Sequence, residues 1–242
     1  MKDGRAIAQQ LVDELRVVLG PRLQSATLYG SWAREEAIPG VSDVNVMVLV
    51  DDIDPRVLSL TAPVAQRWVE SGQTPPLLLE REQWRRAADV FAIELADMRD
   101  AHVALFGADP VTDGQVRTGD LRTQAERELR GKLLQLQTGM LMSSAKPDAL
   151  GLLLMKALPS FTTYLRAVLR IKSLPVPGST TEVIRAALRV INADPAPFLE
   201  AWEARRKAKA WKLNLQDELV NKYFGAAEAT VAYVDQLREV ER

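Results

Sequence analysis

The chain has 242 residues, of which 47% are hydrophobic and 26% charged, and its formal net charge is −1. These values are ordinary for a globular protein with one large or two modest cores. The balanced charge argues against a chain drawn as a whole to nucleic acid or to an anionic membrane. Cysteine is absent and there is one histidine, which excludes a disulfide framework, a thiolate metal site and a multi-histidine zinc site. We expect a cytoplasmic protein with no signal peptide and no membrane partner.

The first part of the chain alternates predicted helices and strands. Apolar residues at helical spacing predict a first helix that ends at Gly20-Pro21, and an Asp54 cap begins a later one. Strands are predicted from Ser25 to the stop at Gly30, and then in "DVNVMVLV" (43–50), "PLLLE" (76–80) and "VFAIELA" (90–96). Short helices are predicted in "REQWRRAAD" (81–89) and "DMRDAHVALFG" (97–107).

A polar stretch, "ADPVTDGQVRTGD" (108–120), is predicted to be a linker because it lacks periodicity and is rich in Asp and Gly. After it, five segments separated by prolines and capping residues are all predicted to be helical. This arrangement predicts an α+β protein with two domains, residues 1–110 and a helical bundle over residues 120–242.

Polar side chains interrupt two of the predicted strands. Asp43 and Asn45 stand two residues apart on one strand and would therefore project from the same face. Oxygen ligands placed in this way suit magnesium. Glu94, the lone acid of the strand predicted over residues 90–96, is the candidate third ligand; alternatively it lies on an open sheet face and meets water.

The Gly-Ser step after the first strand suggests a phosphate site. Ser31 can cap a short helix in "SWAREE" (31–36), and the free N–H groups of a helix N-terminus bind phosphate oxygens. Gly30 would let a phosphate approach the backbone, and Arg34 lies near enough in sequence to contact a triphosphate.

Together these features resemble the nucleotidyltransferase superfamily that includes DNA polymerase β, and most of all its small bacterial members such as the aminoglycoside nucleotidyltransferases. Gly30 and Ser31 match the family's Gly-Ser step, Ser42 and Asp43 match the start of its Asp-x-Asp strand, and Glu94 falls where its third carboxylate is expected. The resemblance covers roughly Leu11 to Gly107 and implies a mixed β-sheet with flanking helices, followed by a helical bundle that helps bind the acceptor.

The activity implied by this resemblance is transfer of a nucleoside monophosphate from a magnesium-bound nucleoside triphosphate, such as ATP, to an acceptor hydroxyl. Asp43, Asn45 and Glu94 would be the catalytic and metal-binding residues. The nucleotide-binding residues would be Gly30, Ser31, Arg34 and Ser42.

Two positions depart from the family pattern. Asn45 stands where the second Asp is expected, and Glu35 stands where many relatives have glycine. An amide can offer a carbonyl oxygen to a cation, but it cannot act as a general base. The alternative function is therefore an inactive module that acts through a nucleotide, a protein partner or a second copy, as nucleotidyltransferase-fold antitoxins do.

Other polar groups have simpler interpretations. We expect His102 to be an ordinary helix-surface residue, and we favour a solvated helix face over nucleic-acid contact for the basic run from Arg205 to Lys212. In aminoglycoside-modifying relatives a carboxylate of the helical part can act as the acceptor base. Here three acids are candidates for that role and the sequence does not separate them: Glu126, Glu128 and Asp148.

Overall fold

The computed structural model describes residues 3–86, 88–113, 116–208 and 210–237. The chain forms two compact units, residues 1–116 and residues 117–242. The elements of the first unit are α1 (Gly4–Leu19), η1 (Gly20–Arg22), β1 (Leu23–Tyr29), β2 (Asn45–Val50), α2 (Pro55–Glu70), β3 (Leu77–Glu80), α3 (Arg81–Arg86), α4 (Ala92–Asp100), β4 (His102–Gly107) and η2 (Pro110–Asp113). Those of the second unit are α5 (Thr118–Ser143), α6 (Pro147–Ile171), α7 (Thr180–Ile191), α8 (Ala196–Arg206) and α9 (Glu218–Gln236).

The first unit is built on a mixed sheet with strand order β3-β2-β1-β4. β1 pairs antiparallel with both β2 and β4, whereas β2 and β3 are parallel and are joined through α2. A parallel pair requires a long crossover, and α2 provides it. At the end of β1, Tyr29 lies between Asn45 on β2 and His102 on β4.

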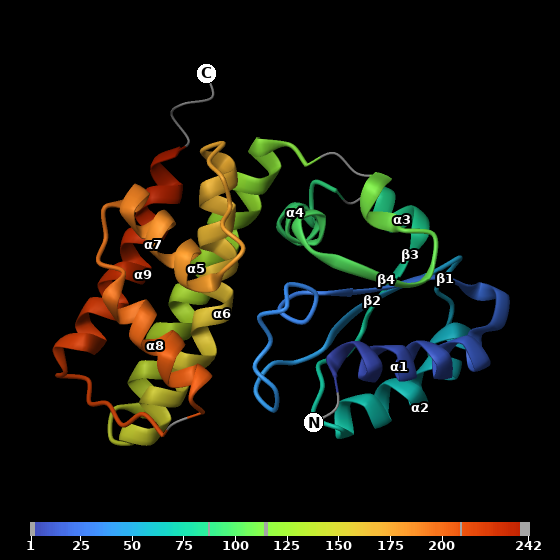
Figure 1. Ribbon diagram of the computed structural model, residues 1–242, viewed down its shortest axis with the longest axis horizontal. Helices are drawn as coiled ribbons and strands as arrows, with labels where there is room; N and C mark the ends of the chain where they lie inside the picture. Colours follow the sequence, from blue (N-terminus) through green and yellow to red (C-terminus); the bar gives the residue numbers. More distant parts are fainter. Residues whose placement is uncertain (1–2, 87, 114–115, 209, 238–242) are drawn as a thin grey trace. The chain divides into compact units, whose positions relative to one another are not determined.

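The two faces of the sheet have separate cores. Alternate residues of β2, Val46 and Val48, pack with α1 and α2, and Val44 just before the strand joins them. Met47 and Leu49 point the other way and pack with residues of α3 and α4. Figure 1 shows the same division, with α1 and α2 on one face and α3 and α4 on the other. The period of two in "DVNVMVLV" thus determines which side chains of β2 point toward α4.

The second unit is a helical bundle whose core contains a cluster of aromatic rings. Phe161 of α6 lies 5.6 Å from Phe198 of α8, measured between ring centroids, and Phe198 lies 4.6 Å from Tyr223 of α9. The Tyr223 hydroxyl donates to the Leu154 carbonyl at 3.1 Å. By length and composition α6 would be able to cross a membrane, but 61% of its most apolar stretch is buried inside the protein, as in a core helix of a globular domain.

The α+β prediction, with a sheet followed by helices, is confirmed, but two of its elements are wrong. A strand was predicted over residues 90–96 and a helix over residues 97–107. The structure instead has helix α4 over residues 92–100 and strand β4 over residues 102–107. A short apolar run such as "VFAIELA" has no periodicity that separates a strand from a buried helix. Its Ala, Leu and Glu residues favour a helix, while the Val and Phe of "HVALFG" favour a strand.

Candidate functional site

The Gly-Ser step forms a single helical turn. The Arg34 N–H donates to the Gly30 carbonyl at 3.1 Å, and the Glu36 N–H donates to the Ser31 carbonyl at 3.0 Å. Glu35 adopts a left-handed conformation with φ of 60°. The hydrogen bond from Glu36 to Ser31 closes a six-residue segment, and the residue before Glu36 is left-handed. This is the Schellman motif that ends a helix, and glycine usually occupies its left-handed position. The short helix predicted from Ser31 is not formed: residues 30–35 make a single hydrogen-bonded turn, and Glu35 occupies the position that favours glycine.

The turn lies directly against the start of β2. Gly30 has a φ of +79°, and a Cβ atom built on it would lie 2.8 Å from the Asn45 amide nitrogen. The carbonyl oxygen of the same amide accepts a hydrogen bond from the Thr74 hydroxyl at 3.2 Å. The structure thus brings Gly30 and Asn45 together, and it gives the Asn45 amide a partner in the loop after α2.

Asp43 lies two residues before the strand that was predicted to carry it. Its side chain is exposed, whereas the next residue, Val44, is buried and donates its N–H to the Gln73 side chain at 2.8 Å. Asp43 lines a surface hollow of about 370 Å³ together with Trp32 and Gln73. Its carboxylate therefore borders a space that small ligands can enter.

Ser42 fixes the loop that precedes Asp43. Its hydroxyl accepts the Ile38 N–H at 2.9 Å, and its own N–H donates to the Ile38 carbonyl at 2.8 Å. The Ser42 carbonyl accepts from the Trp32 indole at 3.3 Å. These contacts give the side chain a role in the shape of the loop, next to the same hollow.

Glu94 comes from a helix and not from a strand. It lies in the first turn of α4 and is half-buried. The pKa of Tyr29 is raised, first by burial and then by the negative charge of Glu94. Tyr29 and Asn45 pair across β1 and β2, and both side chains point to the α4 side of the sheet. Glu94 is thus on the same side of the sheet as Asn45.

No group of three or more His, Asp or Glu residues able to hold a metal ion occurs in the described part of the chain. The predicted ligand set contains only two acids, Asp43 and Glu94. It does not by itself form a complete cage for a cation, but magnesium commonly binds through one or two carboxylates plus substrate phosphates.

Arg34 has other partners than the resemblance implies. Its side chain is only 9% exposed, and its guanidinium donates to the Asp97 carbonyl at 2.8 Å. The same nitrogen lies 3.3 Å from the Asp97 carboxylate. Arg34 therefore joins the turn after β1 to helix α4.

His102 is not a helix-surface residue, as the sequence predicted, but begins strand β4. Its Nδ1 lies 2.7 Å from the Met98 carbonyl, and its Nε2 lies 2.7 Å from the Asp109 carboxylate. Each ring nitrogen thus faces an acceptor to which it can donate a hydrogen bond. Sequence reasoning missed this contact because nothing in the spacing of His102 and Asp109 indicates it.

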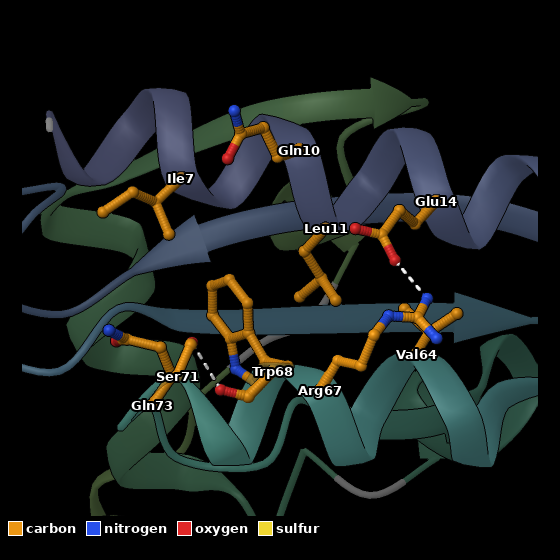
Figure 2. Close-up of a pocket in the computed structure, with 9 residues that line it drawn as sticks. All are labelled: Ile7, Gln10, Leu11, Glu14, Val64, Arg67, Trp68, Ser71 and Gln73. Atoms are coloured by element: carbon orange, nitrogen blue, oxygen red, sulfur yellow. Dashed lines mark hydrogen bonds and ion pairs between the residues drawn. The ribbon is translucent and has the colours of Figure 1, made fainter.

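A second hollow adjoins the first on the α1 and α2 side of the sheet, in the groove between these two helices (Figure 2). Its volume is about 360 Å³, and the buried Trp68 and Leu11 contribute to its apolar part. An ion pair between Glu14 and Arg67 spans the two helices at its edge. The residues that line it are Ile7, Gln10, Leu11, Glu14, Val64, Arg67, Trp68, Ser71 and Gln73, of which Ile7, Ser71 and Gln73 also line the hollow beside Asp43.

In the helical unit, each candidate acceptor base has a partner. Glu126 is only 8% exposed and lies 3.0 Å from Arg122 and 3.6 Å from Arg130. Glu128 accepts from the Gln124 amide at 2.7 Å. Asp148 lies 3.6 Å from Lys212.

The basic run begins in the last turn of α8, and two of its residues form local ion pairs. Arg206 and Lys207 lie 3.1 and 3.5 Å from Glu203. Arg205 donates to the Met155 carbonyl at 3.5 Å, and Lys209 lies outside the described residues. These contacts suit a solvated helix face.

Comparison with known proteins finds a similar solved structure. The crystal structure of spectinomycin adenyltransferase AAD(9) from Enterococcus faecialis with ATP and spectinomycin matches with a TM-score of 0.56 and 11% sequence identity. The match covers 91% of this chain and 98% of that one. The chain has a nucleotidyltransferase fold. No protein-family model matches the chain, and no match is found among curated proteins. The nucleotidyltransferase fold accounts for both units, because the match extends over the sheet and the helical part alike.

Proposed function

We propose that this protein transfers a nucleoside monophosphate from a magnesium-bound nucleoside triphosphate to a hydroxyl group of a small molecule or a protein. The observation that carries the proposal is the close approach of Gly30 to the Asn45 side chain, where a Cβ atom on Gly30 would lie 2.8 Å from the amide nitrogen. It joins the Gly-Ser turn, suited to phosphate, to the strand end that bears the predicted metal ligands. The similarity to an adenyltransferase solved with ATP supports the same reaction class.

In this proposal Gly30 and Ser31 bind the triphosphate. A helical turn leaves its first N–H groups without partners inside the turn, and such groups suit phosphate oxygens. Ser42 shapes the loop beside the hollow that it lines together with Asp43. An exposed carboxylate next to a hollow of about 370 Å³ has space for a nucleotide phosphate beside it.

Carboxylate and amide oxygens are donors that would suit a magnesium ion arriving with the nucleotide. The exposed Asp43 carboxylate would hold it, with Glu94 and the Asn45 amide oxygen as further ligands. When bound, magnesium would neutralise charge on the phosphates and stabilise the departing pyrophosphate. The protein itself binds and orients the triphosphate, which lowers the barrier by fixing the reacting groups.

A second candidate function is a nucleotide- or partner-binding module without transfer activity. The contact between Asn45 and Thr74 favours it, because the amide oxygen already accepts a hydrogen bond and an amide cannot remove a proton. In this case the protein keeps the Gly30–Ser31 turn and the fold but does not transfer a nucleotide.

Thermal unfolding in the presence of magnesium with each nucleoside triphosphate tests whether the protein binds a nucleotide. A nucleotide at 100 times its dissociation constant should add about 2.7 kcal/mol to the free energy of unfolding. Absence of stabilisation by every nucleotide would contradict the transfer proposal and favour a module that acts through a protein partner. Pyrophosphate release with spectinomycin as the trial acceptor then measures transfer.

The variant Asn45→Asp separates the two candidates. If the metal site is weakened, this substitution should increase pyrophosphate release in the presence of magnesium, since a carboxylate replaces a neutral ligand. Asn221→Asp, an exposed position on α9, is the matched control and should leave the rate unchanged. Nucleotide binding without release in both the wild type and Asn45→Asp would support the module.

A further inference from the structure

Arg34 stands four residues after Gly30, yet its side chain is turned away from solvent. Only 9% of the side chain is exposed, and it makes two contacts with one residue of α4. The shorter one, 2.8 Å, is to the Asp97 main-chain carbonyl, and the longer one, 3.3 Å, is to the Asp97 carboxylate. Because the guanidinium donates to a backbone carbonyl, it holds the helix backbone itself and not only the Asp97 side chain.

The contact lies near the C-terminal end of α4. The Asp97 carbonyl also accepts the Ala101 N–H at 3.2 Å, and the next carbonyl, that of Met98, faces His102 at 2.7 Å. Two side chains from separate segments, Arg34 after β1 and His102 on β4, thus hold consecutive carbonyls of the helix. Basic side chains are favourable at a helix C-terminus because of the negative end of the helix dipole.

Glu94 lies three residues before Asp97 on the same helix, so the two side chains share a face of α4. The helix position that Arg34 fixes therefore also sets where the Glu94 side chain lies relative to Tyr29 and the Gly-Ser turn.

We propose that Arg34 is a positioning residue, which holds α4 and thereby Glu94 against the Gly30–Ser31 turn, and that it does not contact the triphosphate. The role of Glu94 in this inference rests on the proposed function. To reach a phosphate, the guanidinium would have to leave a mostly buried site and give up both contacts with Asp97.

Hydrogen–deuterium exchange without any nucleotide tests the positioning. Arg34→Ala should speed amide exchange in α4 (92–100) and in the turn over residues 30–36, and Arg34→Lys should restore part of the protection. Arg99→Lys, which keeps the charge of an exposed residue in the last turn of the same helix, is the matched control and should not change it. Unchanged exchange in α4 of Arg34→Ala would overturn the proposal, and if that variant does not fold, Arg34→Lys against Arg99→Lys gives the same comparison.

Binding and turnover with magnesium–ATP separate positioning from phosphate contact. For Arg34→Ala we expect a dissociation constant within about twofold of the wild type and a kcat lowered by up to about 100-fold. A dissociation constant raised by about tenfold or more, with α4 exchange unchanged, would instead indicate a direct contact with the phosphates.

Asp97→Asn provides the opposite test. Under the positioning model it weakens the hold on α4 and leaves nucleotide affinity equal or lower. Tighter magnesium–ATP binding by Asp97→Asn would overturn the model, since Asp97 would then be competing with a phosphate for Arg34. If the wild type binds no nucleotide, the proposed function fails, while the exchange experiment still decides whether Arg34 positions α4.

Discussion

Gly30 and Asn45 are in direct contact, and a side chain at position 30 would collide with the Asn45 amide. A Cβ atom there would lie 2.8 Å from the amide nitrogen, and the backbone of Gly30 has a φ of +79°. The conformation requires glycine, and a Cβ atom would in addition displace the Asn45 amide. The contact brings the turn after β1 against the first residue of β2.

The variant Gly30→Ala should destabilise the protein more than Gly40→Ala. Both glycines have a φ of +79°, but a Cβ on Gly40 meets no atom within 4 Å. We expect a loss of about 1 kcal/mol for Gly40→Ala from backbone strain alone. Gly30→Ala should lose about 1–3 kcal/mol more because of the collision. Urea unfolding measures both, and Asn45→Ala introduced into each variant should recover only the extra loss at position 30. Equal losses would contradict the contact.

The variant Glu35→Gly should stabilise the protein. Glu35 is exposed and has a φ of 60° in the Schellman stop, where a residue with a side chain is strained. Removing that strain should raise the free energy of unfolding by about 1 kcal/mol. Glu35→Ala removes the charge but keeps the strain, so it serves as the control. If both variants gain equally, the charge and not the conformation is responsible.

The variant Thr27→Val should also stabilise the protein. Thr27 is completely buried in β1, and its hydroxyl has no hydrogen-bond partner among the described residues. Replacing it by an apolar group of the same shape should add about 1 kcal/mol to the free energy of unfolding. Thr230→Val is the control, because that hydroxyl is also buried but donates to the Ala226 carbonyl at 2.8 Å. A loss of stability in Thr27→Val would show that the hydroxyl has a partner, such as a water molecule.

The contact between His102 and Asp109 predicts a pH dependence. Burial opposes the charge of Asp109, but hydrogen bonds from His102 and the Val111 N–H outweigh it and lower the pKa of this carboxyl below its ordinary value. A carboxylate with a lowered pKa stabilises the fold above the unfolded pKa of about 3.9, and this contribution is lost as the pH falls through the folded value.

Stability of the wild type and Asp109→Asn should therefore be compared across pH. The difference in their free energy of unfolding should be constant near neutral pH and should shrink below about pH 4. Thermal unfolding at several pH values measures it. A difference that does not change on acidification would contradict the assigned ionisation of Asp109.

The strongest periodic signals were readable from the sequence. The period of two in residues 44–50 and the helical spacing before Gly20 predicted β2 and α1, and the Asp54 cap accepts the Val57 N–H as expected. Such patterns are local, because they depend on which faces of one segment are apolar. The strand predicted around Glu94 was wrong for the same reason, since a short, mostly apolar run fits either a strand or a buried helix.

The sequence by itself determined the α+β class, the Gly30–Ser31 turn and the polar residues of the candidate site. Only the tertiary structure decided which of these residues meet. The Arg34–Asp97 contact joins positions 63 residues apart, and the Asn45–Thr74 bond joins positions 29 apart. Such pairs depend on how α4 and the loop after α2 pack on the sheet, and a packing relationship leaves no pattern in the spacing of a single chain.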